Sequence, residues 1–171
     1  MTGIASNQLR SAFVAESTAG TTPSSPSFTT SDVPINMTAA PNVIEHRSLA
    51  AKGEAVETAI AGIDVTGSMS GTLVYGAYDP FLESLLQGAY STNVLKSAKT
   101  TKSFTIENAI SAGVGGTLTM MRYTGVEASG GSITLASNAE IGFSFDLTGM
   151  GSLDTTTSAI GSSSYTDQTE R

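Results

Sequence analysis

The nine residues IDVTGSMSG, residues 63–71, alternate between two kinds of side chain. Ile63, Val65 and Met69 share the odd positions with two glycines, whereas Asp64 and the hydroxyl residues that follow it occupy the even positions. A period of two is typical of a β-strand that buries one face. The same alternation recurs along the chain and predicts a mainly β protein with antiparallel strands. Further examples are VPINM (33–37), SFTIENAI (103–110), SITLAS (132–137) and EIGFSFDLTG (140–149).

Asp64, Thr66 and Ser68 also spell D-x-T-x-S, which looks like the first ligand set of a metal-ion-dependent adhesion site. Such a site belongs to a parallel α/β sheet, in which helical crossovers of a dozen residues or more join the strands. Alternate residues of a strand are about 6.6 Å apart, which is too far for three ligands of one small cation. We therefore interpret the stretch as a strand with a polar outer face and expect no metal site. A metal-dependent adhesion module is the weaker alternative.

One segment, YDPFLESLLQG (78–88), predicts a short amphipathic helix rather than a strand. Asp79 is its expected N-cap, Pro80 its first helical residue, and Gly88 the residue just past its end. Glu83, Ser84 and Gln87 are expected on the outer side. The predicted fold is an antiparallel β-sandwich or barrel with this one α-helix and extended terminal arms. The core-facing side of the helix is predicted to carry Phe81, Leu82, Leu85 and Leu86.

The composition predicts a central folded unit between two arms. Residues 1–31 are poor in charge and rich in Ser, Thr, Ala and Pro, and residues 151–171 have a similar character. Such segments bury little apolar area and are typical of extended arms. We therefore predict an N-terminal arm (1–31), a β-sandwich (32–150) and a C-terminal arm (151–171).

The charge and the motifs exclude several classes of function. The 171 residues contain no Cys and one His, and they carry a formal net charge of −7, which argues against tight binding to a nucleic-acid backbone. We find no catalytic motif, and the Gly-rich SAGVGGT (111–117) is better explained as a hairpin connection than as a phosphate loop. The N-terminus lacks the apolar core of a signal peptide, and no apolar run reaches membrane-spanning length. We expect no enzyme activity and no cofactor.

Four stretches resemble, in their order and spacing, the tail tube proteins of long-tailed bacteriophages. The resemblance extends from about Gln8 to about Leu147, with Ala19 standing where an aromatic is common and Ala98 where Gly is usual. The four stretches are FVAESTAGTTPSSP (13–26), SGTLVYGAYDPFLESLLQG (70–88), NVLKSAKTTKSFTIEN (93–108) and RYTGVEASGGSITLASNAEIGFSFDLTG (122–149).

The resemblance implies a virion protein, assembled in the host cytoplasm, whose subunits form rings, commonly of six, that stack into a tube. Its partners would be further copies of the chain and other tail proteins, namely the tape measure, tail terminator and distal tail proteins. DNA would pass through without specific binding. Six subunits with four strands each would close a barrel about 37 Å across at roughly 4.8 Å per strand, which leaves room for a duplex. Another virion β-sandwich, such as a head–tail connector or tail terminator, is an alternative.

Two groups of residues become candidates on this interpretation. The lumen is expected to be acidic, because basic walls would hold phosphates; its candidates are Glu57, Asp64, Glu107 and Asp146, on polar faces of predicted strands. The loop HRSLAAKGEA (46–55) separates two β-like stretches without a tight-turn pattern, and it is expected to contact the neighbouring ring. Its candidate contact residues are His46, Arg47, Lys52 and Glu54.

Overall fold

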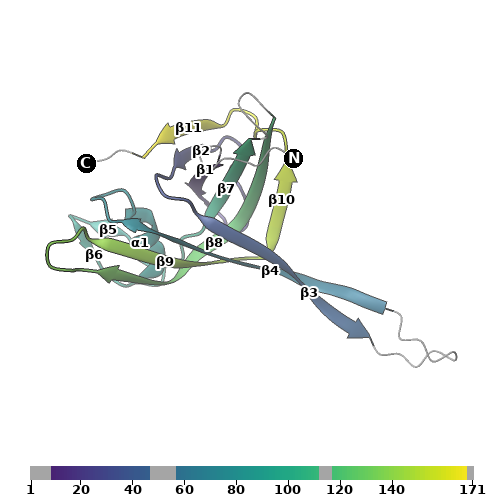
Figure 1. Cartoon of the computed structure of the whole chain (residues 1–171), viewed down its shortest axis with the longest axis horizontal. Coiled ribbons are helices and arrows are strands. Elements are labelled where there is room, and N and C mark those ends of the chain that lie inside the picture. The colour runs from purple at the N-terminus through teal and green to yellow at the C-terminus, as the bar shows by residue number, and fades with distance from the viewer. Residues whose placement is uncertain (1–8, 47–56, 112–116, 169–171) are drawn as a thin grey trace.

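The strand β8 (Leu118–Thr134) belongs to two sheets and joins them into the nine-stranded arrangement of Figure 1. This computed structural model describes residues 9–46, 57–111 and 117–168. In these ranges the chain is mainly β with one short α-helix, as the alternating sequence predicted, and the sheet is not a closed barrel. The other elements are β1 (Leu9–Ala15), β2 (Ser27–Thr30), β3 (Asn36–His46), β4 (Glu57–Thr72), α1 (Asp79–Leu85), β5 (Tyr90–Ser91), β6 (Val94–Leu95), β7 (Phe104–Ser111), β9 (Gly142–Gly149), β10 (Ser152–Thr156) and β11 (Ser164–Asp167).

The first sheet has the strand order β11-β2-β1-β7-β8, and β10 pairs with the same part of β8 from its other edge. Its neighbours are antiparallel except for β11, which runs parallel to β2. Strand β7 is central, and residues 104–109 are buried on both faces, so its sequence is not a simple alternation of inner and outer residues.

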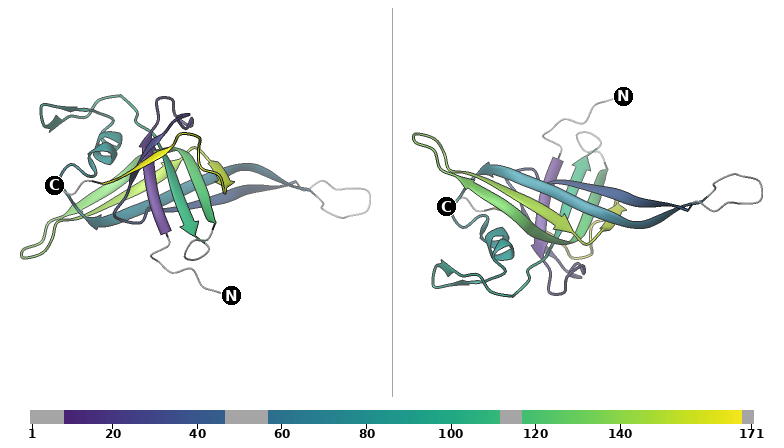
Figure 2. Two further views of the ribbon diagram at one scale, coloured as in Figure 1. Left: turned by 90° about the horizontal axis from the view of Figure 1, so that it is seen from above. Right: turned by 90° about the horizontal axis from the view of Figure 1, so that it is seen from below.

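The second sheet has the order β8-β9-β4-β3, and every neighbouring pair is antiparallel. Strands β3 and β4 form a long hairpin whose outer half extends beyond β9, because β9 pairs only with residues 65–72 of β4. Figure 2 shows this hairpin leaving the body on one side while the turn between β8 and β9 points the opposite way.

The core lies between the two sheets and under α1. It contains most of the apolar residues on the predicted inward strand faces, together with aromatic rings from the helix and from β1. Ile63, Ile133, Leu135 and Ile141, on the same faces, are exposed because they lie where the strands extend past the core. Phe81 of α1 lies against Phe13 and Phe104, with ring centroids 4.8 Å and 4.9 Å away. The main core residues of the second sheet are Val65, Met69, Phe143, Phe145 and Leu147, and those of the first sheet are Phe13, Phe104, Ile106, Tyr123 and Val126.

Gly125 marks the place where β8 passes from one sheet to the other. Its φ of +63° is a conformation that favours glycine, and an added Cβ would collide with the Met150 side chain. The Gly125 N–H donates to a carboxylate oxygen of Glu16 at 3.0 Å instead of to a ladder partner. The pairing register of β8 then shifts between Ala128 and Gly130, so the change of sheet uses a glycine and a bulge together.

The helix differs in detail from the prediction. Its N-cap is Tyr78, whose side chain makes no capping hydrogen bond, and Asp79 is the first helical residue. Ser84, predicted to face outward, is buried. Its hydroxyl is satisfied there, since it donates to the Lys102 carbonyl and accepts from the Ala128 N–H. The prediction is correct for Phe81, which is buried, and for Leu82 and Leu85, which pack against the core, but Leu86 is exposed.

The described parts of the two low-complexity segments differ from the predicted arms. Residues 9–30 supply β1 and β2, and residues 152–167 supply β10 and β11, so all four strands belong to the first sheet. The partner of β1 is β7, nearly one hundred residues later, and a composition count cannot detect such distant pairing. The burial of Ala12, Phe13 and Phe28 supplies apolar contacts that these segments would lack as separate arms.

Candidate functional site

One face of the second sheet packs on the core and the other is polar; we call the latter the polar sheet face. Along β4, Val65 and Met69 are buried, whereas all the even-numbered residues from Asp64 to Thr72 are exposed. The cross-strand registers place residues of the other three strands in rows with these exposed positions. The polar sheet face comprises Asn36, Thr38 and Ala40 of β3, Asp64, Thr66, Ser68, Ser70 and Thr72 of β4, Ser144, Asp146 and Thr148 of β9, and Glu127, Gly130, Ser132 and Thr134 of β8.

The second sheet is acidic throughout. Strands β3, β4 and β9 and residues 127–134 of β8 contain no Lys or Arg. Asp64 and Asp146 lie exposed on the polar sheet face, and Glu127, which the sequence analysis did not single out, joins them from β8 opposite Thr148. A strand-by-strand count of basic residues would have revealed this property, since it needs no knowledge of pairing. The face therefore repels a polyanion and offers it no basic contact.

Two of the four lumen candidates differ from Asp64 and Asp146. Glu57 begins β4 opposite His46, and only its backbone position is described. Glu107 is fully buried in β7 and does not lie on an open polar face, so its assignment to a lumen wall is wrong. The reason is that β7 is covered on both sides, and the polar face of this strand supports a buried ion-pair network.

Glu107 accepts hydrogen bonds from three side chains on three other strands. The Arg122 Nε lies 2.8 Å from one carboxylate oxygen, and the Arg10 guanidinium and the Tyr165 hydroxyl lie 3.3 Å and 2.7 Å from the other. Tyr165 also stacks on Phe28 and lies under the Arg10 guanidinium, 3.8 Å from ring centroid to Cζ. This network attaches β11 to β1, β7 and β8.

The phenol of Tyr165 has a raised pKa. Its partial burial disfavours the phenolate, and the hydrogen bond to the Glu107 carboxylate raises the pKa further. The neutral phenol donor is therefore the stable form in the fold.

The second sheet has two edges with unpaired strand backbone in the described chain. At one edge, β3 is the last strand in the order, and its Pro41 is compatible with an edge position because it has no N–H. At the other edge, β8 pairs with β9 beyond residue 126 but no longer with β7. Ser84 of α1 covers the start of this second edge through the Ala128 N–H.

The outer half of the β3–β4 hairpin exposes apolar side chains. Val43 and Ile60 lie opposite each other, and both side chains are exposed. The side chains of Ile44 and Ile63, elsewhere in the same hairpin, are exposed as well. A two-stranded ribbon is marginally stable alone, and grouped exposed apolar residues are typical of an interaction surface. His46 ends β3, at the predicted boundary between strand and loop. The other contact candidates, Arg47, Lys52 and Glu54, lie outside the described residues.

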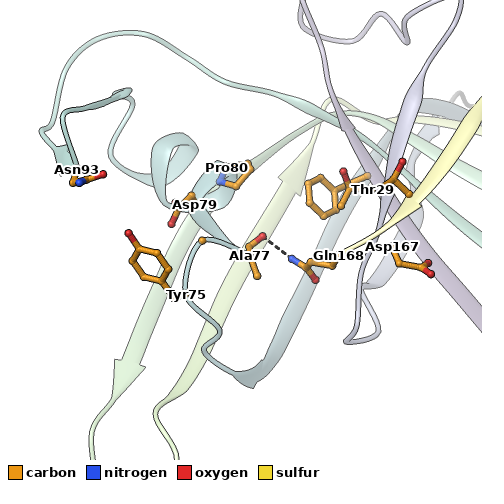
Figure 3. A pocket seen from close by; sticks show the side chains of 11 residues that line it. Thr29, Tyr75, Ala77, Asp79, Pro80, Asn93, Asp167 and Gln168 are labelled. Carbon is orange, nitrogen blue, oxygen red and sulfur yellow. Dashed lines mark hydrogen bonds between the residues drawn. The ribbon is translucent and has the colours of Figure 1, made fainter. Parts of the chain in front are cut away.

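A hollow of about 480 Å³ lies between the chain leading into α1 and the C-terminal strand (Figure 3). Gln168 closes one side, with its amide donating to the Ala77 carbonyl. Asp79 and Asp167 are among its lining residues, but they lie apart as single carboxylates in Figure 3. Within the described ranges, no three or more His, Asp or Glu side chains form a group that could hold a metal ion.

The fold and the polar sheet face define a β-sandwich subunit with two open edges. The sequence profile of the phage tail tube proteins matches residues 6–170. The chain therefore belongs to the phage tail tube protein family and is a structural subunit of the virion tail. No curated protein sequence matches. In the described part of the chain, no helix has the length and apolar character needed to cross a membrane.

Solved structures with the same fold come from tubes and related injection machines. The SPP1 tail tube has a TM-score of 0.59 at 8% identity, covering 94% of this chain and 82% of that one. The anti-feeding prophage baseplate has a TM-score of 0.58 at 10% identity, and the match covers 91% of this chain and 97% of that one. The sheath/tube terminator of an extracellular contractile injection system, PVC, has a TM-score of 0.56 at 10% identity, and the match covers 91% of this chain and 98% of that one. Identities this low show similarity of fold.

Proposed function

We propose that the chain forms rings, commonly of six copies, that stack into the tail tube through which DNA leaves the virion. The observation that carries this proposal is the second sheet, with its cation-free polar face and an open strand edge on each side. Membership of the tail tube family supports it. The chain acts as a wall and not as an enzyme.

Strand directions allow the two open edges to join. The four strands of the second sheet alternate in direction, so β3 of one copy runs antiparallel to β8 of a neighbouring copy. Edge-to-edge addition therefore continues an antiparallel sheet, with one bond missing at Pro41. Closure of six copies would place 24 strands in a barrel about 37 Å across. It would also remove the exposed edges, which favour uncontrolled association in an isolated sandwich.

The polar sheet face then becomes the lumen wall, because the opposite face is committed to the core. Asp64, Asp146 and Glu127 would line the channel together with rows of Ser and Thr. Their carboxylates repel phosphates, so DNA slides past without specific binding. Glu57 remains a candidate for the same wall.

The β3–β4 hairpin extends past the sandwich and would reach the neighbouring ring. Its exposed Val43, Ile44, Ile60 and Ile63 would be buried there. We assign the predicted contact residues His46, Arg47, Lys52 and Glu54 to this contact. Deletion of residues 49–53 should leave folded subunits and rings but no elongation. Tubes of normal length from this deletion would show that the hairpin end does not mediate stacking.

Electron microscopy of the purified protein tests the proposal directly. Hollow tubes with a regular axial repeat are expected. A protein that yields only single rings would be a terminator or connector, for which the similarity to a sheath/tube terminator provides the argument. A protein that stays monomeric at high concentration would contradict both. The tape measure, terminator and distal tail proteins are the proposed further partners.

A further inference from the structure

A row of residues crosses the second sheet from one open edge to the other. Ile133 of β8 lies opposite Phe143 of β9, and Phe143 lies opposite Gly71 of β4. Val33 completes the row: an added Cβ on Gly71 would collide with its side chain. The row is thus Ile133, Phe143, Gly71 and Val33, and it has an apolar side chain at each end.

The Ile133 end of the row belongs to an exposed apolar projection. The turn between β8 and β9 extends past the last paired residue of β4, Thr72, which lies opposite Gly142. One aliphatic side chain ends the core-facing row of β8, and two more continue the core-facing rows of β8 and β9 into this turn; all three are exposed. They are Ile133, Leu135 and Ile141, with exposed fractions of 48%, 75% and 40%; we call them the apolar knob.

The Val33 end of the row belongs to a pocket of about 360 Å³ beside the start of β3, which we call the β3-edge pocket. The location of this pocket follows from the hydrogen bonds of Ile35, the residue between the pocket lining and β3. The Ile35 N–H donates to the Ser11 hydroxyl at 3.2 Å, and the Ile35 carbonyl accepts from the Asn108 side-chain amide at 2.9 Å. These partners belong to the first sheet, so the pocket lies between the two layers. Its lining is Leu9, Ser11, Ser31, Asp32, Val33 and Pro34.

Strand direction decides which ends meet when two copies join. Strand β8 runs toward the knob and ends at Thr134, whereas β3 starts at Asn36, next to the pocket. In an antiparallel junction the end of β8 lies beside the start of the neighbour's β3. Both the knob and the pocket are on the core side of the sheet. In such a junction, the knob of one copy would therefore lie beside the pocket of the next.

We infer that the apolar knob is the docking element of a ring contact and that it inserts into the β3-edge pocket of a second copy. This inference rests on the proposed ring and specifies its lateral interface. The contact is heterologous, because knob and pocket are different surfaces, and such contacts close into rings when the rotation between copies is right. Apolar burial supplies the attraction, and the strand edges supply the register.

Disulfide cross-linking tests the contact cleanly, because the chain has no cysteine. Leu135→Cys is combined in turn with Leu9→Cys, Val33→Cys or Pro34→Cys, and assembled protein is treated with a mild oxidant. A disulfide requires Cα atoms within about 7 Å. We expect at least one pair to give a ladder of covalent oligomers on a denaturing gel, ending at the ring size. Each single-cysteine variant should remain monomeric on that gel.

The outcomes separate this contact from the proposed function. Tubes that assemble from all three double variants without any ladder would overturn the inference and leave the ring proposal standing. Cross-linking of Leu135→Cys alone would also overturn it, since knob would then contact knob. Failure of the unmodified chain to form rings would remove both proposals together.

A polar substitution gives an independent readout. Leu135→Asn should abolish rings while the thermal unfolding of the subunit is unchanged, because Leu135 is outside the core. Met150→Asn, at a comparably exposed apolar residue on another part of the fold, is the matched control and should assemble. Normal ring yield from Leu135→Asn would contradict the inference.

Discussion

The carboxylate of Glu107 joins four strands at a single point. It is fully buried, and its partners come from β1, β8 and β11. Arg122 is nearly buried as well, with 8% of its side chain exposed, and its guanidinium also donates to the Ser158 carbonyl at 3.0 Å. Removing either charge would leave the other without its main compensation in an apolar setting.

We predict that Glu107→Ala lowers the free energy of unfolding by about 3–5 kcal/mol, the usual cost of leaving one charge of a buried ion pair without its partner. Glu107→Gln should cost less, since the amide oxygen still accepts from Arg122. Chemical denaturation of the subunit measures both values. Glu140→Ala, which removes an exposed carboxylate, is the control and should change little. Equal stability of Glu107→Ala and Glu140→Ala would contradict the role given to the network.

Tyr165 makes a pH-dependent contribution to the same network. Because its pKa is raised above the usual 10.0 in the fold, its contribution to stability is complete below about pH 10 and is lost as pH rises through the folded pKa. Tyr165→Phe should be less stable at neutral pH, by about 1.5–3 kcal/mol for the lost hydrogen bond to the charged Glu107 carboxylate, whose oxygen keeps its contact with Arg10. Its stability should fall less steeply above pH 10 than that of the unmodified chain. Parallel alkaline unfolding curves for the two proteins would refute this.

At the scale of one element, α1 combines an apolar face with one buried hydroxyl. Phe81, Leu82 and Leu85 were predictable from helical spacing, and they pack on the core. Ser84 was not, because a serine carries no signal of burial unless its backbone partners are known. Those partners are the Lys102 carbonyl and the Ala128 N–H, so the hydroxyl attaches the helix to the edge of β8.

Ser84→Ala should therefore destabilise the subunit by about 1–3 kcal/mol, since the buried Ala128 N–H loses its acceptor. Thermal or chemical unfolding measures the change. The matched control is Ser97→Ala, at an exposed serine in the loop that follows β6, which should be neutral within about 0.5 kcal/mol. A neutral Ser84→Ala would mean that another group satisfies the Ala128 N–H.

At the scale of the whole molecule, the polar sheet face has one charge sign. We predict that Asp64→Lys together with Asp146→Lys permits tube assembly but slows DNA release, because cations repeated in every ring attract phosphates. The delay should shrink as salt rises, through screening and reduced counterion release. Dye-detected DNA release from virions carrying the variant, at two salt concentrations, measures this effect.

Asp167→Lys is the control for this experiment, because it changes an exposed carboxylate on β11 of the first sheet by the same charge. Release as fast as normal from the double lysine variant, or an equal delay from the control, would show that the polar sheet face does not line the channel.

Sequence alone predicted what depends on local pattern. The alternation of residues 63–71 and 140–149 gave the strands and their polar sides, and the order of motifs indicated the family. Distant pairing could not be predicted in the same way: β1 joins β7, and Glu107 looks like any carboxylate on an alternating strand until β11 covers it. The change of sheet along β8 could not be predicted either, because it depends only on the backbone conformation of Gly125 and on a bulge between Ala128 and Gly130.

The position of Tyr165 has a consequence for synthesis on the ribosome. Glu107, Arg10 and Arg122 are all translated well before residue 165, so their buried network lacks its phenol donor until β11 emerges from the exit tunnel. Strand β2 must also wait for β11 at its outer edge. Folding of the first sheet is therefore completed only after β11 has been translated. A nascent chain that stalls before Tyr165 cannot complete this sheet.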